Sequence, residues 1–153
     1  MPKYIIYMED DDATLRWNVG RLQKEFPEYE FLKCRSTDRA QKEFEEHMEE
    51  VVCIVTDINM TEEFLDEQYV DETDGGMFTG WVWLYRYVLE QNPKLHIPIV
   101  ICSGFNEYLR RYNLYRDNCG KYRIRIIDRG HTEGKGTKGI IVAIKDYIRE
   151  GLM

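Results

Sequence analysis

The chain has 153 residues and a formal net charge of −7, a size that predicts one domain over residues 1–153. Its apolar fraction of 43% and aromatic fraction of 13% exclude an intrinsically disordered chain, and its apolar runs are too short to span a membrane. The acidic balance disfavours direct binding to nucleic acid, because phosphate backbones attract basic surfaces.

The cysteines and histidines lack the spacing of a disulfide framework or a zinc site. Cys34, Cys53, Cys102 and Cys119 lie far apart in the sequence, which favours buried thiols in a reducing compartment. The three histidines show no i, i+4 pairing with one another. The N-terminus also lacks the apolar stretch of a secretory signal, so we expect a cytoplasmic protein.

The first predicted strand ends at a run of acids. Residues 4–8 are apolar, as in a parallel strand buried on both faces, and Glu9, Asp10, Asp11 and Asp12 follow at once. Apolar residues then recur at helical spacing over 13–25, until Pro27 ends the pattern.

The same alternation continues along the chain. Strands that alternate with helices form a parallel sheet with helices on both faces. We predict an α/β fold with a flavodoxin-like, doubly wound five-stranded parallel sheet in the order 2-1-3-4-5 and five helices. The aromatic residues of the third helix, Trp81, Trp83, Tyr85 and Tyr87, should pack mostly in the core. Any of them that stay exposed would offer a docking surface. Further strands are predicted at residues 29–34, 51–56, 97–102 and 122–127, and further helices at 36–50, 80–91, 105–116 and 137–149.

Carboxylates follow two strands that are neighbours in this order. Ligands of such sheets bind beyond the carboxyl ends of the strands, so Glu9, Asp10 and Asp57 should gather at one edge. Their repulsion calls for a cation, and Mg²⁺ suits oxygen ligands with open positions. An aspartate beside Mg²⁺ can attack a phosphoryl group, and Ser103 at the next strand end could bind a phosphoryl oxygen. For either acid cluster alone, a solvated turn that caps a helix is the alternative.

Four sequence pieces occur in a specific order and strand context. They are IIYMEDDD, VCIVTDINM, GWVWLYRYV and PIVICSG, and together they span about residues 4–110. With these pieces the chain resembles the receiver (CheY-like) domain of two-component response regulators. The resemblance implies a phosphoacceptor rather than an enzyme, able to take a phosphoryl group from small donors and to lose it again.

The resemblance also implies a role for individual residues. Asp57 matches the phosphoacceptor, and Glu9 and Asp10 match the acidic pair that holds Mg²⁺ together with Asp57. Asn59 matches the residue whose backbone carbonyl binds the metal, and Ser103 matches the switch hydroxyl. In receivers, phosphorylation shifts the population between two packings of the face that would here be about residues 105–149.

The end of the fifth strand departs from the receiver pattern. Receivers carry a lysine followed by a proline there, whereas this chain reads RIIDRGHTEGKG. Arg129, or Lys135 from the loop that follows, could supply the positive charge, as could Arg125 if the strand is shorter. An arginine contacts phosphate as a planar fork and is not an equivalent replacement. The aromatic partner of the switch hydroxyl is also missing from its usual place, although Tyr122 lies close by.

Two loops complete the pattern. Residues 130–139 contain four glycines but lack the spacing of a nucleotide-binding loop. Residues 61–74 lengthen the loop after Asp57 and could cover the site or slow phosphoryl access, but we expect them to be disordered or mobile. This acidic loop contains no basic residue. Its seven acids are Glu62, Glu63, Asp66, Glu67, Asp71, Glu72 and Asp74.

Three functions remain open. The favoured one is a stand-alone receiver that accepts a phosphoryl group on Asp57 and signals by a conformational switch, since the chain ends soon after the last predicted helix. Its partners would be a sensor histidine kinase or phosphotransfer protein and an unknown output protein, with a homodimer as a further option. The second is a phosphorylation-independent pseudo-receiver that binds partners, which the missing lysine motivates. The third is a Mg²⁺-dependent phosphohydrolase, which needs a general acid or base near Asp57.

Overall fold

Five parallel strands form one sheet in the order β2-β1-β3-β4-β5, which confirms the predicted strand order. The structure is a computed structural model, and it describes residues 1–60, 66–104, 106–129 and 135–153. Apolar side chains fill both faces of the three central strands, as their continuous apolar sequences indicate. The strands are β1 (Tyr4–Met8), β2 (Glu30–Cys34), β3 (Val51–Thr56), β4 (Ile99–Ser103) and β5 (Ile124–Asp128).

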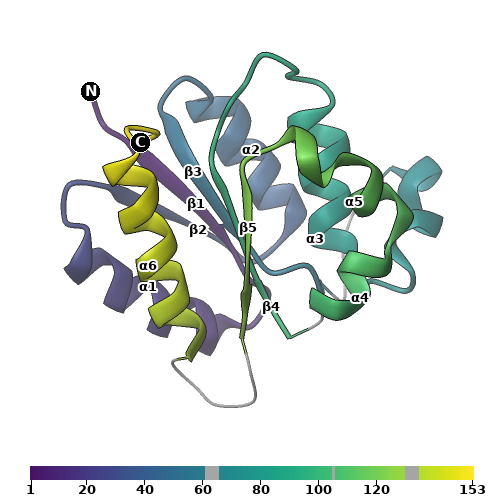
Figure 1. Ribbon diagram of the computed structural model, residues 1–153, viewed down its shortest axis with the longest axis horizontal. Helices are drawn as coiled ribbons and strands as arrows, with labels where there is room; N and C mark the ends of the chain where they lie inside the picture. Colours follow the sequence, from purple (N-terminus) through teal and green to yellow (C-terminus); the bar gives the residue numbers. More distant parts are fainter. Residues whose placement is uncertain (61–65, 105, 130–134) are drawn as a thin grey trace.

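Helices cover both faces of the sheet (Figure 1). On one face lie α1 (Asp12–Glu25) and α6 (Lys135–Arg149), and on the other α2 (Thr37–His47), α3 (Thr79–Trp83), α4 (Asn106–Arg111) and α5 (Asn113–Asn118). Each face has its own apolar core, because successive side chains of a strand point to opposite sides. Within β1, Ile5 and Tyr7 pack on the α1 and α6 side, and Ile6 and Met8 on the other.

The third predicted helix changes its winding halfway along. Helix α3 ends at Trp83 and continues as a π-helical segment, η2 (Leu84–Leu89), in which the Tyr85 carbonyl accepts from Glu90 N–H at 2.8 Å. Of the four aromatic residues expected in the core, Trp81 and Trp83 are buried, whereas Tyr85 and Tyr87 are half-buried. The π-helical segment carries Arg86, which contacts the acidic loop.

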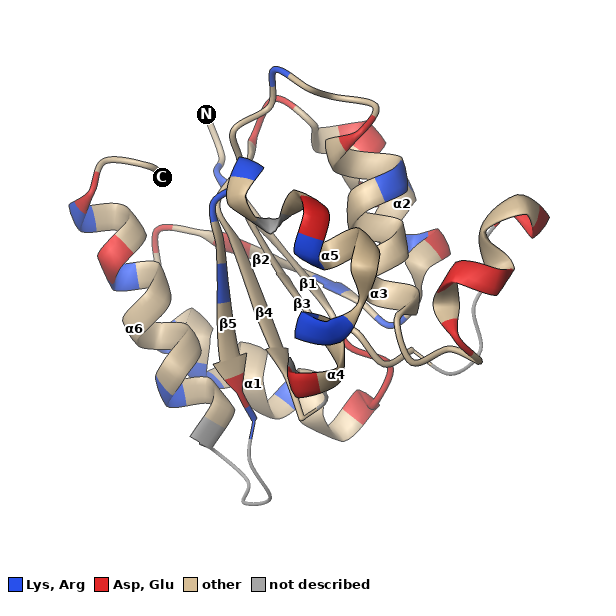
Figure 2. Cartoon of the chain, turned by 45° about the vertical axis from the view of Figure 1, so that its right-hand side comes forward, with Lys and Arg blue, Asp and Glu red and all other residues tan. Residues whose placement is uncertain are grey.

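The prediction of disorder is wrong for residues 66–74 of the acidic loop. A short 3₁₀ helix, η1 (Glu67–Thr73), forms there, and its acids are seen in red beyond α3 in Figure 2. Arg86 Nη2 lies 2.6 Å from Glu72 Oε1, and the Tyr87 hydroxyl donates to Asp66 Oδ2 at 2.9 Å. These contacts order an acidic segment that has no base of its own. The remainder of the loop, residues 61–65, lies outside the described residues.

The helix predicted over residues 105–116 is two helices, α4 and α5, which are separated at Tyr112. The Tyr112 ring stacks on Phe78 at 4.4 Å between centroids, and its hydroxyl donates to the Glu72 carbonyl at 2.6 Å. A tertiary contact thus coincides with the break. Among the described residues, none of the helices combines the length and the apolarity that crossing a bilayer requires.

Candidate functional site

A cleft of about 450 Å³ opens at the carboxyl ends of the strands. Side chains from the ends of β1, β3, β4 and β5 meet there, as expected for a parallel sheet of this order. The lining carries four carboxylates and one guanidinium. The lining residues are Glu9, Asp10, Asp11, Asp57, Asn59, Ser103, Gly104 and Arg129.

The acids after β1 divide into two kinds. Glu9 is buried, and its N–H continues the sheet by donating to the Cys34 carbonyl at 3.0 Å. Asp11 is the N-cap of α1 and accepts from Thr14 N–H at 3.0 Å, while Asp12 pairs on the surface with Arg16 at 3.0 Å. The alternative of a solvated, helix-capping turn therefore describes Asp11 and Asp12, but not Glu9.

Asp57 lies directly after β3 and is fixed by its backbone. Its N–H donates to the Met8 carbonyl at 3.0 Å, and Asn59 N–H donates to Asp57 Oδ1 at 3.2 Å. The N-terminus of α3 passes close by, since Gly80 N–H donates to the Ile58 carbonyl at 3.0 Å. The Asp57 carboxylate is thus held beside Glu9 at the floor of the cleft.

Arg129 reaches the same carboxylates from the end of β5. Its Nη1 lies 3.2 Å from Asp57 Oδ2 and 3.4 Å from Glu9 Oε2, and its Nη2 donates to Thr14 Oγ1 at 2.9 Å. Because β5 ends at Asp128, one residue beyond the predicted end, Arg129 is the first residue after the strand. Its backbone N–H is directed to the Ser103 carbonyl at 3.4 Å.

Ser103 is the last residue of β4 and is buried beside the acids. Its hydroxyl hydrogen-bonds the Asp57 carboxylate. Ser103 pairs in register with Asp128, which brings the β4 end and the β5 end to the same edge. A hydroxyl and a guanidinium therefore flank Asp57 on two sides.

Burial raises the pKa of both Glu9 and Asp57, whose residues are 3% and 5% exposed. The charge of Asp57 raises the pKa of Glu9 further, because two like charges in one site oppose each other. The hydrogen bonds from Ser103 and Asn59 and the charge of Arg129 act in the opposite direction on the pKa of Asp57. The pair of carboxylates therefore favours a nearby cation.

The donor set fits a hard divalent cation. Glu9, Asp10 and Asp57 offer carboxylate oxygens to the cleft, and Asn59 lines it too. Mg²⁺ typically binds through one or two carboxylates and retains several waters, which an open cleft permits. Burial raises the pKa of Glu9 and of Asp57, and the positive charge of Arg129 acts to lower both.

Two other residues that the sequence suggested for the site, Arg125 and Tyr122, lie away from the cleft, and the side chain of a third, Lys135, is not described. Arg125 Nη1 pairs with Asp146 Oδ2 of α6 at 2.5 Å, away from the cleft, so the suggestion that it supplies the cation is wrong. The Tyr122 ring contacts Tyr85 before β5 begins, at the opposite end of that strand from the edge where Ser103 lies. Lys135 begins α6, but its side chain is outside the described part of the structure, as are residues 130–134.

Thr14 is a functional candidate that sequence reasoning missed. It lies in the first turn of α1, and its hydroxyl holds the guanidinium of a residue 115 positions later. No local pattern distinguishes a threonine with this role from one that stabilises a helix start. Only the approach of β5 to α1 reveals it.

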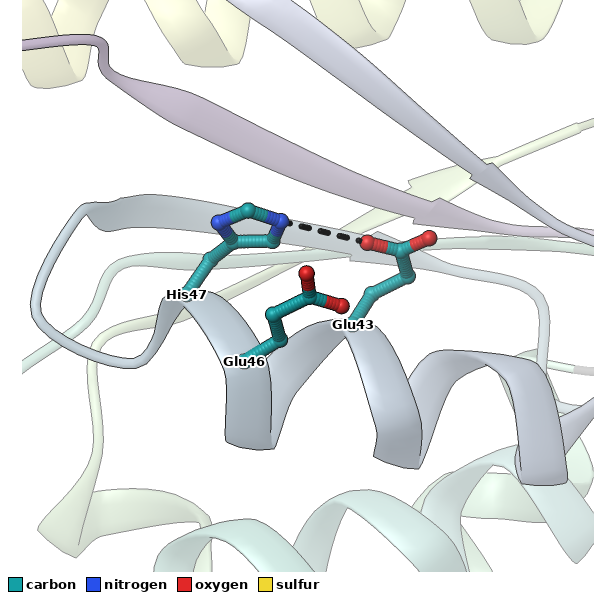
Figure 3. Close-up of side chains that lie close together, drawn as sticks. All are labelled: Glu43, Glu46 and His47. Carbon is teal, nitrogen blue, oxygen red and sulfur yellow. Dashed lines mark ion pairs between the residues drawn. The ribbon is translucent and has the colours of Figure 1, made fainter.

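A second group of potential metal ligands lies on α2 (Figure 3). Glu43, Glu46 and His47 place one ligand atom each within 4.8 Å of one another. Glu43 is paired with Arg39 and with His47 Nε2, which lies at 3.5 Å, and the His47 ring packs on Tyr4 at the start of β1. This edge of the sheet is opposite the cleft, and the contacts are those of an ion-paired helix surface.

Comparison with known proteins finds similarity in structure alone. No family model matches the chain, and a search of curated proteins finds no match. Several solved structures share its fold over nearly their whole length.

Three of these solved structures are bacterial or archaeal receivers. A response regulator receiver domain protein from Clostridium thermocellum has a TM-score of 0.66 at 14% identity and covers 97% of this chain and 96% of its own. A CheY-like receiver domain protein from Methanospirillum hungatei JF-1 has a TM-score of 0.66 at 17% identity, with 98% and 96% covered. The signal receiver domain of an HD domain-containing protein from Pseudomonas fluorescens Pf-5 has a TM-score of 0.61 at 12% identity, with 98% and 97% covered.

The sheet order, the helices on both faces and these similarities lead to one conclusion. The chain has the fold of the receiver domains of response regulators.

Proposed function

We propose that this protein is a receiver that accepts a phosphoryl group on Asp57 and passes the signal on by binding a partner. The observation that carries the proposal is the contact of 3.2 Å between Arg129 Nη1 and Asp57 Oδ2. It supports a phosphate-binding cation at the end of β5, where the receiver resemblance leads us to expect a lysine. A guanidinium and a hydroxyl beside one buried carboxylate suit the stabilisation of phosphoryl oxygens.

In this proposal an oxygen of Asp57 attacks phosphorus and forms the new P–O bond. The bond from phosphorus to the donor breaks, which is a P–N bond in a phosphohistidine and a P–O bond in acetyl phosphate, and the donor group leaves with the electron pair. Arg129 and Ser103 bind phosphoryl oxygens, while Glu9, Asp10, Asp57 and the Asn59 carbonyl would hold Mg²⁺. Bound there, Mg²⁺ would supply charge neutralisation for the carboxylate and the phosphoryl group. The donor would be a sensor histidine kinase or a phosphotransfer protein.

The test is the intact mass after incubation with acetyl phosphate and Mg²⁺. We expect one labile phosphoryl adduct on the native protein and none on Asp57→Asn, because the amide is not a nucleophile for phosphorus. Asp12→Asn is the matched control, since this acid lies on the same turn as Glu9 but pairs with Arg16 on the surface. It should retain the adduct.

Two other outcomes would redirect the proposal. An unmodified native protein that still binds Mg²⁺ would indicate the pseudo-receiver, a module that binds partners without phosphorylation. Steady release of phosphate from a phosphomonoester, lost in Asp57→Asn, would indicate a phosphohydrolase. The second outcome has the least support, because no histidine lines the cleft in the described part of the chain.

A further inference from the structure

One nitrogen of Arg129 lies between the two buried carboxylates. Nη1 is 3.4 Å from Glu9 Oε2 and 3.2 Å from Asp57 Oδ2, so a single donor bridges the two acids. A second cation that is to bind between Glu9 Oε2 and Asp57 Oδ2 must compete with Arg129 for this position. The guanidinium therefore already provides, in the resting protein, part of the charge that these acids need.

The position of Arg129 is held from the side of α1. Nη2 donates to Thr14 Oγ1 at 2.9 Å, which leaves Nη1 directed at the acids. One turn further along α1, Asn18 Oδ1 accepts from the Thr137 hydroxyl at 2.6 Å. Helix α1 thus contacts the chain at Arg129, directly after β5, and at Thr137, in the first turn of α6.

We propose that Arg129 is a resting counter-ion of Glu9 and Asp57 that a divalent cation must displace, and that Thr14 is the positioning residue that sets how firmly it is held. The inference rests on the proposed function, since it concerns the metal that phosphoryl transfer would use. It addresses access of the metal to the carboxylates and not the transfer itself.

The chemistry of arginine makes displacement necessary. A lysine in a crowded cationic site can lose its proton, whereas a guanidinium remains charged at every physiological pH. Two cations within a few ångströms repel strongly in a partly buried site. The Arg129 side chain is 34% exposed and therefore has solvent into which it can turn. Relief must come from movement, and the Thr14 hydrogen bond opposes that movement.

The affinity for divalent metal tests the inference directly. Mn²⁺ binding is followed by the electron paramagnetic resonance signal of free Mn²⁺, and Mg²⁺ binding by competition, at constant ionic strength. We expect Arg129→Met to bind about tenfold more tightly and Thr14→Val about threefold more tightly than the native protein, as for the loss of a counter-ion and of one hydrogen bond. Thr14→Ser, which retains the hydroxyl, should keep the native affinity.

Arg125→Met is the matched control. It removes one positive charge from β5, the strand that Arg129 follows, but that charge is paired with Asp146 away from the cleft. Its affinity for the metal should stay within about twofold of the native value, since the charge removed is distant and is screened by salt. An increase equal to that of Arg129→Met would mean that net charge alone controls the metal, and would overturn the inference.

The double variant separates positioning from a direct effect. In an Arg129→Met background, Thr14→Val should change the metal affinity no further, because its only proposed action is through Arg129. An unchanged or weaker affinity in Arg129→Met refutes displacement, and so does a full Thr14→Val effect in that background. If the variants bind the metal as tightly as the native protein does and Asp57 is still phosphorylated, the inference fails while the proposed function stands. If no variant binds metal, both the inference and the metal part of the proposed function fail.

Discussion

Asn18 is the centre of a buried hydrogen-bond chain. Its amide nitrogen donates to the Tyr7 hydroxyl at 2.8 Å, and its Oδ1 accepts from the Thr137 hydroxyl at 2.6 Å. The chain joins β1, α1 and α6 through three side chains that are all buried. A buried polar network of this kind stabilises a fold only while its members keep their partners.

Thr137→Val removes one partner and leaves the shape of the side chain almost unchanged. The buried Asn18 Oδ1 then loses its donor, so we expect the free energy of unfolding in urea to fall by about 1–3 kcal/mol. The same substitution in an Asn18→Ala background should cost much less, because the acceptor is already gone. Equal losses in the two backgrounds would show that Thr137 acts through packing and not through this hydrogen bond.

At the scale of elements, α3 is placed by the absence of a side chain at Gly80. A Cβ built there would lie 2.0 Å from the Asp57 carbonyl oxygen and 3.0 Å from Ile58 Cα. Both are backbone atoms of the segment that follows β3, so neither can turn aside. The close approach of α3 to the site therefore requires glycine at this position.

Gly80→Ala should force α3 away from the end of β3. We expect a loss of about 3 kcal/mol in the free energy of unfolding, together with slower labelling of Asp57 by acetyl phosphate. Gly20→Ala is the control in α1, where an added Cβ meets nothing within 4 Å. It should stabilise the protein by about 0.5–1 kcal/mol, since alanine favours helix. A Gly80→Ala protein as stable as the native one would contradict a steric requirement for glycine beside the Asp57 carbonyl.

At the scale of the whole molecule, one sheet separates two apolar cores, and each core contains buried thiols. Cys34 lies in the core under α2 and α3, and Cys53 and Cys102 lie in the core under α1 and α6. Burial raises the pKa of Cys34 and of Cys102 to about 12, and the pKa of Cys53 is raised as well. These thiols stay protonated and unreactive while the fold is intact.

Thiol labelling therefore reports whether the two cores unfold together. In a Cys119→Ser background we expect no reaction with a thiol reagent at pH 8 in buffer, and reaction of all three thiols within one denaturant transition. Separate transitions for Cys34 and for the other two thiols would contradict a single cooperative unit.

The free energy of unfolding should also fall as the pH rises above about 8.5, because thiols ionise in the unfolded chain but not in the folded one.

The sequence by itself determined the sheet, because its information lies in local patterns. Apolar runs bounded by acids and helical periodicity between them predicted five parallel strands in their order, and also the burial of Trp81 and Trp83. Parallel strands bring their carboxyl ends to one edge, so the gathering of Glu9, Asp57 and Ser103 in one cleft followed from the fold class. Their chemical roles stay proposals until Asp57 is tested.

Tertiary structure alone decided the contacts between distant segments. Whether Arg129 or Arg125 faces the acids depends on where β5 ends, and a shift of one residue changes the side chain presented to the cleft. The order of residues 66–74 depends on Arg86 and Tyr87, and the break between α4 and α5 coincides with the contacts of Tyr112. Such partners are 14 to 40 positions apart, and Thr14 and Arg129 are 115 apart. Local periodicity carries no information about pairs at that separation, so packing decided them.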